Sequence, residues 1–312
     1  MTCYPRRCII PPVMSGAARL EDVYEPIRAE LEAVRRTLTE QLRSGESLVD
    51  EICRYVASDR GKLLRPALFF LSLRSLGRRD LSPELIHTAS SIELIHIASL
   101  IHDDIIDGSP TRRGRESLWK RFGLESAVVF VDLIFSRALR MLSGVGRPEV
   151  WEALAEAVAE MCEGEILQIH LRGRPDVCER DCLRISLKKT ASLFSTACAL
   201  GAVMAEGDGE EIERFAEFGR LFGLAYQMAD DLRDLEGEDA PIGEPTLPSI
   251  ELERRGIKGI EAIAPRIERY LGEAWAAIAF LQPSPYKDSI GKLIDWLTQR
   301  ARGCLGRDLR GR

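Results

Sequence analysis

Two segments of the chain carry the pattern Asp-Asp-x-x-Asp, which is suited to binding a metal ion. The six acidic residues are Asp103, Asp104, Asp107, Asp230, Asp231 and Asp234. The first and last aspartates of each pattern are four residues apart, so on a helix both carboxylates project from one side toward one point. Like charges at this spacing repel, so the arrangement indicates a cationic ligand. Hard carboxylate oxygens favour Mg²⁺, which keeps water ligands and bridges to substrate phosphates.

A single acidic triplet is weak evidence, because such triplets are ordinary at solvated helix ends. This chain has two copies, with Asp103 and Asp230 lying 127 residues apart, and each copy follows an apolar segment. The repetition favours a metal-dependent site over two solvated helix ends.

Basic residues stand near the first acidic pattern and upstream of it. Arg112 and Arg113 follow the pattern within the Gly/Pro-containing stretch 108–114, and Lys62 and Arg65 lie one turn apart in the stretch 60–66. Guanidinium groups form bidentate contacts with phosphate oxygens, so the first pair suits a metal-bridged diphosphate and the second pair suits another anion. Taken alone, Lys62 and Arg65 are better explained as solvated residues at the start of a helix.

Helices are expected to position all of these residues. Apolar residues recur at helical spacing in almost every segment, and Gly and Pro clusters divide the chain into about ten helices or more with short connections. This pattern predicts an all-α, single-domain helical bundle rather than βαβ units. Residues 90–101 are apolar on more than one face, which predicts a central helix ending at the first acidic pattern.

Composition excludes several classes of protein. The 312 residues are 45% hydrophobic and carry a net charge of −6, which excludes a disordered chain and argues against nucleic-acid binding. Eight scattered cysteines indicate reduced thiols and a cytoplasmic location. The sequence has no apolar run of about 18 residues, so we expect no integral membrane segment. We expect residues 1–20 to be a flexible extension, with Met14 as an alternative start, and residues 21–312 to form the folded domain.

Several stretches, in order and at matching spacing, carry a family resemblance. They are GKLLRP at 61–66, ELIHIASLIHDDIIDGSPTRRG at 93–114, EGEILQ at 163–168, KTASLF at 189–194, YQMADDLRD at 226–234 and EPTLP at 244–248. Over residues 24–300 the chain resembles the trans-isoprenyl diphosphate synthases, or polyprenyl synthetases. The resemblance implies the isoprenoid synthase fold, in which a helical bundle surrounds a central apolar cavity, and a homodimer.

The same resemblance assigns roles to particular residues. Asp103, Asp107 and Asp230 are implied to be the main ligands of three Mg²⁺ ions, with Asp104, Asp231 and Asp234 as supporting acids. The implied substrates are isopentenyl diphosphate, at Lys62, Arg65, His96 and Arg113, and an allylic diphosphate, at Arg112, Lys189, Thr190 and Gln227. For His96, a core histidine on an apolar face is the alternative that the resemblance overturns.

The implied reaction is head-to-tail prenyl transfer. Metal ions and guanidinium groups stabilise the departing diphosphate, the allylic C–O bond ionises, and isopentenyl diphosphate attacks the carbocation. In the family that the chain resembles, the residues one turn before the first aspartate limit chain growth. Here they are the small residues Ala98 and Ser99, with Ile92 and Ile95 deeper, so the resemblance implies a product of C20 or longer. Phe130 or Phe135 on another helix is an alternative limit to chain growth.

Some positions depart from the family pattern. The segment after Asp234 is short and lacks the usual Gly-Lys pair, Glu244 stands in place of a Lys, and Val131 stands in place of a Gly. Two alternatives stay open. The short segment favours a partner-dependent or non-catalytic subunit of a heteromeric synthase. The other alternative is a class I terpene cyclase, which needs no second diphosphate site, so the presence of Lys62, Arg65, His96 and Arg113 argues against it.

Overall fold

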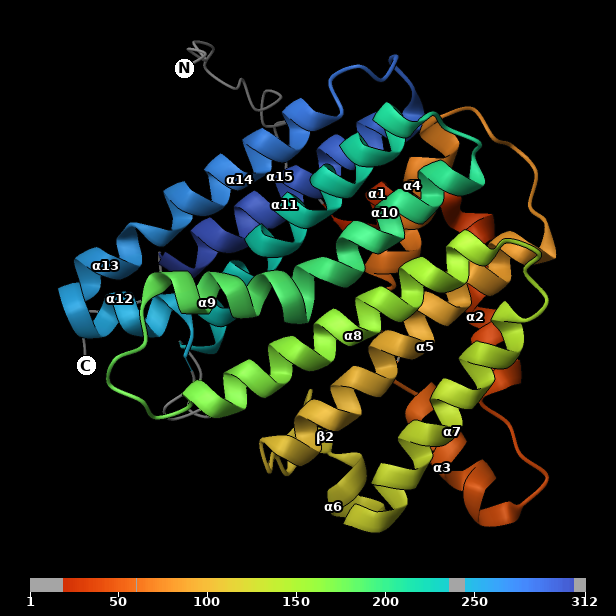
Figure 1. Cartoon of the computed structure of the whole chain (residues 1–312), viewed down its shortest axis with the longest axis horizontal. Coiled ribbons are helices and arrows are strands. Elements are labelled where there is room, and N and C mark those ends of the chain that lie inside the picture. The colour runs from red at the N-terminus through yellow and green to blue at the C-terminus, as the bar shows by residue number, and fades with distance from the viewer. Residues whose placement is uncertain (1–18, 60, 236–244, 306–312) are drawn as a thin grey trace. The chain divides into compact units, whose positions relative to one another are not determined.

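The computed structural model describes residues 19–59, 61–235 and 245–305, and these form mainly helices (Figure 1). The helices are α1 (Leu20–Tyr24), η1 (Glu25–Ile27), α2 (Arg28–Gln41), α3 (Ser47–Ala57), α4 (Leu64–Ser75), α5 (Pro83–Ile106), α6 (Leu118–Phe122), α7 (Leu124–Leu142), α8 (Pro148–Leu171), α9 (Glu179–Ser186), η2 (Leu187–Ala191), α10 (Ser192–Met204), α11 (Gly209–Asp234), α12 (Leu247–Arg255), α13 (Ile257–Glu261), α14 (Ile263–Ala277) and α15 (Pro285–Leu305). The predicted all-α fold class is confirmed.

Contacts within the chain define two compact units. Unit 1 contains Leu71–Arg78, the segment from Ala155 onward and the α1 region, and unit 2 contains Ile27–Phe70 and Arg79–Leu154. The single domain expected for residues 21–312 stays a prediction. The expected extension, up to residue 18, and Met14 lie outside the described residues, as does Glu244. Within the described residues, every helix is too short or too polar to cross a membrane.

In unit 2, α5 is the central helix, as its sequence predicts. It packs against α2, α6 and α7, and every side chain from Thr88 to Ile95 is buried. Fully burying an Ile or Leu side chain contributes about 1.5–3 kcal/mol, so residues such as Ile92 and Leu94 anchor this helix firmly. The last turn of α5, which carries the first acidic pattern, is therefore held on a rigid support.

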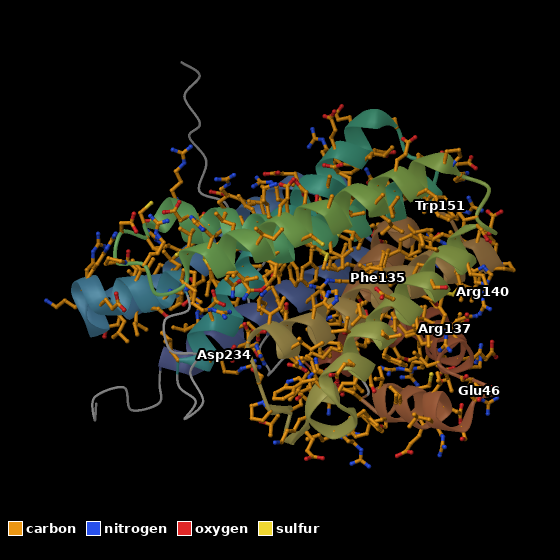
Figure 2. All side chains as sticks on the ribbon, turned by 60° about the horizontal axis from the view of Figure 1, so that its bottom comes forward. Glu46, Phe135, Arg137, Arg140, Trp151 and Asp234 are labelled. Carbon is orange, nitrogen blue, oxygen red and sulfur yellow. The ribbon has the colours of Figure 1, made fainter. Side chains whose placement is uncertain are left out.

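Helix α7 is also fixed within unit 2 by a buried arginine. Arg137 is labelled on α7 in Figure 2. Its Nη1 donates to Cys53 Sγ at 3.2 Å, and its Nη2 donates to the Arg43 carbonyl oxygen at 2.9 Å. These bonds join α7 to α3 and to the connection that precedes α3. Val131, which departs from the family pattern, is fully buried in the core of this unit.

In unit 1, α11 is the central helix, and two glycines let α10 approach it closely. Helix α11 packs against α10, α14 and α15. A Cβ atom on Gly219 would lie 2.5 Å from the Phe194 carbonyl oxygen, and one on Gly223 would lie 2.7 Å from Ala191 Cα. Because the obstructing atoms belong to the backbone, only glycine fits at these positions. The close contact fixes the face of α11 that carries the second acidic pattern.

The stretch after the first acidic pattern forms a small hairpin, which the sequence did not predict. Strands β1 (Thr111–Arg112) and β2 (Arg115–Glu116) are antiparallel, with Arg112 paired to Arg115. The two turn residues, Arg113 and Gly114, have φ values of 51° and 75°. A two-residue turn with both φ values positive matches the right-handed twist of the strands, so the hairpin gives Arg112 and Arg113 defined positions.

Candidate active site

The first acidic pattern lies at the carboxyl end of α5. The helix ends at Ile106, Asp103 lies in its last turn, and the Asp107 N–H donates to the Asp103 carbonyl oxygen at 2.9 Å. That last turn contains no basic residue. The end of a helix carries partial negative charge, so each acid there is disfavoured by about 0.3–1 kcal/mol. This placement calls for a cation.

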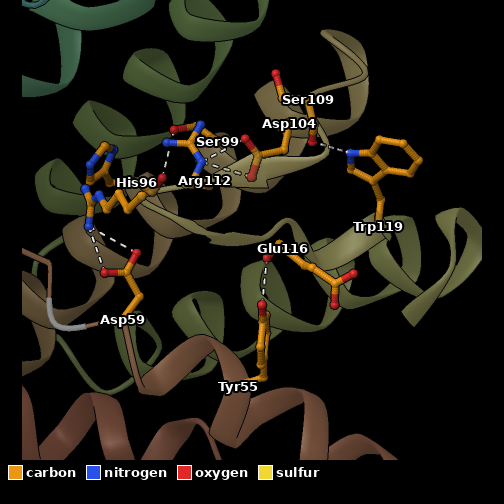
Figure 3. A network of polar contacts seen from close by, with 10 residues as sticks. Tyr55, Asp59, His96, Ser99, Asp104, Ser109, Arg112, Glu116 and Trp119 are labelled. Carbon is orange, nitrogen blue, oxygen red and sulfur yellow. Dashed lines mark hydrogen bonds and ion pairs between the residues drawn. The ribbon is translucent and has the colours of Figure 1, made fainter. Parts of the chain in front are cut away.

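The second residue of the first acidic pattern, Asp104, is buried and paired with Arg112. Arg112 Nε lies 2.8 Å from Oδ1 and 2.9 Å from Oδ2 of Asp104 (Figure 3). Burial raises the pKa of Asp104, and the charge of Arg112 opposes that rise. The pair joins the end of α5 to the hairpin and holds Arg112 beside the acidic pattern.

The hairpin is tied to its surroundings by three residues that the sequence analysis missed. Arg113 Nη1 donates to Asp59 Oδ1 at 2.9 Å, the Tyr55 hydroxyl donates to the Glu116 carbonyl oxygen at 2.6 Å, and Trp119 Nε1 donates to the Ser109 carbonyl oxygen at 2.9 Å (Figure 3). All of these bonds lie within unit 2. They link residues up to 61 positions apart in the chain, so no local sequence pattern indicates them.

Three residues predicted to bind isopentenyl diphosphate act electrostatically on one another in unit 2. Arg65 is buried, and burial lowers the pKa of His96 well below its ordinary value, helped by the charges of Arg65, Arg113 and Arg112. His96 is therefore neutral, and its Nδ1 atom is buried without a hydrogen-bond partner in the described structure. Lys62, the fourth predicted residue, is half-buried just before α4.

Glu93 is a buried acid in this group that sequence reasoning missed. It lies one turn before His96 on α5, and burial raises its pKa to about 7, against the opposing charges of Arg65, Arg113 and Arg35. Its Oε2 atom has no hydrogen-bond partner in the described structure. Because Glu93 stands within an apolar run, its sequence context resembles that of an ordinary core position.

In unit 1, the structure brings Lys189 and Thr190 together with the second acidic pattern through a π-helical turn, η2. Thr190 Oγ1 donates to Gln227 Oε1 at 2.5 Å, and Gln227 Nε2 donates to Asp231 Oδ1 at 2.6 Å. Burial raises the pKa of Asp231 to about 7, although the bond from Gln227 opposes the rise. Asp231, like Asp104, is therefore a buried member of its pattern with a side-chain partner.

Lys189 is held by α8. Its ammonium group forms a short ion pair with Glu165. A Cβ atom on Gly164 would lie 2.6 Å from the Lys189 backbone nitrogen, so a glycine is needed for α8 to pack this closely on η2. Within the EGEILQ stretch, Gly164 is therefore needed for the close packing and Glu165 for the ion pair with Lys189.

The outer acids of the second pattern are bound by arginines. Asp230 Oδ1 lies 3.0 Å from Nη2 of Arg233 and 3.0 Å from Nη2 of Arg300, which is on α15. Asp234 Oδ1 lies 3.2 Å from Nη2 of Arg233. Burial raises the pKa of Asp234, and the charge of Asp230 adds to the rise.

The predicted site residues therefore form two groups, one in each unit. The group in unit 2 contains Lys62, Arg65, His96, Asp103, Asp104, Asp107, Arg112 and Arg113, and the group in unit 1 contains Lys189, Thr190, Gln227, Asp230, Asp231 and Asp234. Their roles stay predictions.

The donor set fits magnesium. Among the described residues, no three His, Cys, Asp or Glu side chains are gathered closely enough to hold a metal ion by themselves. Mg²⁺ binds through one or two carboxylates together with substrate phosphates and water, so it does not need such a cage. Asp103, Asp107 and Asp230 supply hard oxygen atoms of this kind.

Comparison with known proteins decides the family. The family model described as Polyprenyl synthetase matches residues 46–269, which include both acidic patterns. The chain belongs to the polyprenyl synthetase family. The predicted resemblance is confirmed.

Individual members of the polyprenyl synthetase family align along most of the chain. Octaprenyl diphosphate synthase of Escherichia coli is 32% identical over 293 residues, covering 90% of this chain and 88% of that protein. Heptaprenyl diphosphate synthase component 2 of Geobacillus stearothermophilus is 34% identical over 227 residues, covering 73% and 70%. The crystal structure of a decaprenyl diphosphate synthase from Rhodobacter capsulatus superposes with a TM-score of 0.83 at 25% identity, covering 91% of this chain and 100% of that one. These matches confirm an enzyme of the prenyl diphosphate synthase type.

Proposed function

We propose that this polyprenyl synthetase condenses isopentenyl diphosphate with an allylic diphosphate to give a trans-prenyl diphosphate of C20 or longer. The observation that carries the proposal is the placement of both acidic patterns at the carboxyl ends of central helices, each close to basic residues. An acid at such a position is stabilised by a cation, and a cation there attracts diphosphate.

Each group of residues has a part in the reaction. Asp103, Asp107 and Asp230 would hold Mg²⁺, which when bound stabilises the charge of the leaving diphosphate. Arg112 and Lys189 bind the allylic diphosphate, and Thr190 and Gln227 lie beside the first carbons of its chain. Asp104 holds the Arg112 guanidinium group in position, and Glu165 holds the Lys189 ammonium group.

The second substrate is bound by Lys62, Arg65, His96 and Arg113. His96 is neutral, so it contributes an N–H donor rather than a charge. The allylic C–O bond breaks with its electron pair going to the diphosphate, and the double bond of isopentenyl diphosphate forms the new C–C bond. The proton that is then lost goes to the released diphosphate, so no side chain needs to serve as the base.

Product length is proposed from residues of α5. Ser99 lies one turn before Asp103 and is half-buried, while Ala98, Ile95 and Ile92 are buried behind it. Small side chains next to the acidic pattern leave room for a growing chain. Relatives named as octaprenyl and geranylgeranyl diphosphate synthases support a product of C20 or longer.

The deciding experiment uses the purified chain alone with Mg²⁺, isopentenyl diphosphate and a series of allylic diphosphates. We expect prenyl products of C20 or longer, and losses of about a hundredfold or more in kcat for Asp103→Asn and Asp230→Asn. Asp132→Asn is the control, because Asp132 is an exposed acid on α7. Predominant C15 release would refute the product length.

The same assay separates the two alternatives. A relative named as component 2 of a heptaprenyl diphosphate synthase favours a partner-dependent subunit as the second candidate. No turnover by the chain alone, with turnover restored by a second protein, would favour that candidate. Consumption of an allylic diphosphate without isopentenyl diphosphate would favour a terpene cyclase.

We also propose a homodimer in the cytoplasm that binds no nucleic acid. Helix α7 carries exposed apolar side chains, Leu124, Val128 and Leu139, with the half-buried Phe135 on the same stripe. Such a stripe suits pairing with a second copy. Cys53, Cys162, Cys178, Cys182 and Cys198 are free thiols, which suits a reducing compartment.

A further inference from the structure

A single carboxylate oxygen of the second acidic pattern is shared by two arginines from different helices. Asp230 Oδ1 lies 3.0 Å from Nη2 of Arg233, on the same helix α11, and 3.0 Å from Nη2 of Arg300, on α15. Asp230 is also the predicted metal ligand of this pattern. A metal ion bound at this oxygen would compete with both guanidinium groups for its lone pairs, so metal binding there would weaken the contacts of the arginines with Asp230.

Each guanidinium group has several N–H donors, so an arginine whose contact with Asp230 is weakened has donors for a further anion, while Arg233 keeps its contact with Asp234. Arg300 stays in place, because its side chain is only 21% exposed and its Cζ atom lies 5.7 Å from the centre of the Trp296 ring. Arg233 is 45% exposed and is able to turn. A diphosphate held through metal ions by the same acidic pattern would supply such an anion.

The sequence that follows the second acidic pattern makes Arg233 and Arg300 more important for binding a diphosphate. Residues 235–246, which follow the second pattern, include four acidic residues and no Lys or Arg. Lys189, held by Glu165, is one cation on this side. Arg233 and Arg300 contact the second acidic pattern itself, so they are placed to add positive charge for a diphosphate.

We propose that Arg233 and Arg300 are diphosphate-binding residues that neutralise Asp230 in the free enzyme and transfer to the outer oxygens of the allylic diphosphate when metal ions take Asp230. This inference rests on the proposed function and adds two substrate-binding residues to it. It predicts different effects on two ligands. Removing either arginine weakens diphosphate binding but does not weaken the binding of Mg²⁺ alone.

The test measures binding by calorimetry on the full chain, with two probes: Mg²⁺ alone, and inorganic diphosphate in saturating Mg²⁺. For Arg233→Ala and Arg300→Ala we expect the Kd for diphosphate to rise about tenfold, as for the loss of one charge-assisted hydrogen bond. The Kd for Mg²⁺ alone should stay the same or fall. Arg300→Lys, which keeps the charge, should lie between Arg300→Ala and the unaltered chain.

Two matched controls separate a specific effect from a general loss of charge. Arg220 lies on α11 in an i,i+3 pair with Glu217 and is 41% exposed, close to the value for Arg233. Arg302 lies on α15, two residues after Arg300, and pairs with Glu268. We expect Arg220→Ala and Arg302→Ala to bind both probes within twofold of the unaltered chain.

Two outcomes would overturn the inference. One is diphosphate binding within twofold of the unaltered chain in both Arg233→Ala and Arg300→Ala, and the other is parallel weakening of Mg²⁺ and diphosphate. If Arg300→Ala does not fold, Arg233→Ala and Arg300→Lys decide. A chain that shows the expected binding pattern but fails to condense the two substrates refutes the proposed function and leaves this inference standing.

Discussion

At the scale of single residues, the buried acids are the least expected feature of this enzyme. Glu93, Asp104 and Asp231 are all buried, and burial raises the pKa of each. A buried carboxylate is costly unless opposite charges or hydrogen bonds compensate it. Each of these acids lies beside a residue predicted to bind substrate, which suggests that they orient the binding groups.

Glu93 should give stability a measurable dependence on pH. Its folded-state pKa of about 7 lies above the ordinary value of 4.5, so between these values the folded state holds a proton that the unfolded state has lost. Stability therefore falls as pH rises through this window. In Glu93→Gln that fall should be absent, making the variant more stable at pH 8, by about 3 kcal/mol at most.

The measurement is denaturant unfolding of both proteins at pH 8 and at pH 5. Near pH 5 the two should converge, because a protonated Glu and a Gln have nearly the same shape and charge. The exposed Glu125→Gln on α7 serves as the control and should change stability by less than about 0.5 kcal/mol at either pH. A constant difference between Glu93→Gln and the unaltered chain across pH would contradict the prediction.

Ser99 offers the sharpest test of product length. Its hydroxyl donates to the His96 carbonyl oxygen at 2.8 Å within its own helix, so replacing it loses only a local bond. Ser99→Phe should place a bulky ring one turn before Asp103 and shift products to shorter chains while turnover persists. Ala98→Phe is a weaker test, because Ala98 is fully buried and overpacking there costs about 1–3 kcal/mol.

Chromatography of radiolabelled products would decide the matter, with Ser99→Ala as the matched small-residue control. Products of unaltered length from an active Ser99→Phe enzyme would place the limit to chain growth elsewhere. The buried Phe130 on α7 is then the next residue to replace.

At the scale of helices, much of the architecture follows from the sequence. Apolar spacing predicts the helices, and the two-faced apolar run at 90–101 predicts the central α5. The π-helical turn at Leu187–Ala191 was not predicted, because nothing in local propensity distinguishes it from a continuing α-helix. The pairing of Arg112 with Asp104 and of Arg300 with Asp230 depends on tertiary contacts, the second across 70 positions, so the sequence pattern carries no signal for either.

The packing of α8 on the π-helical turn should be sensitive to one methyl group. In Gly164→Ala the new Cβ would meet the Lys189 backbone nitrogen at 2.6 Å and the Lys188 backbone carbon at 3.1 Å. Neither atom is able to rotate away, so we expect a loss of about 1–3 kcal/mol in unfolding free energy. We also expect a lower kcat, because Lys189 moves with its backbone.

The control for that change is Gly209→Ala. Gly209 begins α11, and a Cβ atom there meets nothing within 4 Å. Urea unfolding and the condensation rate should both stay close to those of the unaltered enzyme. Equal behaviour of the two alanine variants would show that α8 yields easily and that Gly164 does not position Lys189.

At the scale of the whole molecule, the assembly state is the property that a single chain reveals least directly. The exposed stripe on α7 adjoins the buried side of that helix, which packs on α5, so the apolar surface of α7 extends beyond its own core. A surface helix that served only its own core would carry polar residues on the outer side. Leu124, Val128 and Leu139 therefore favour burial against a second copy, and stable interfaces of this kind bury about 1,200 Å² or more.

Val128→Asp should separate the proposed dimer, because it would bury an unpaired carboxylate in an apolar contact. We expect the molar mass measured by light scattering after size exclusion to fall from about twice the chain mass of 34.9 kDa toward a single chain. Leu48→Asp is the control, since Leu48 is an exposed apolar residue on a different helix, α3. If Val128→Asp keeps the mass of the unaltered protein, α7 is not the interface. If the unaltered protein is itself a single chain, the proposed homodimer is wrong and the partner-dependent alternative gains support.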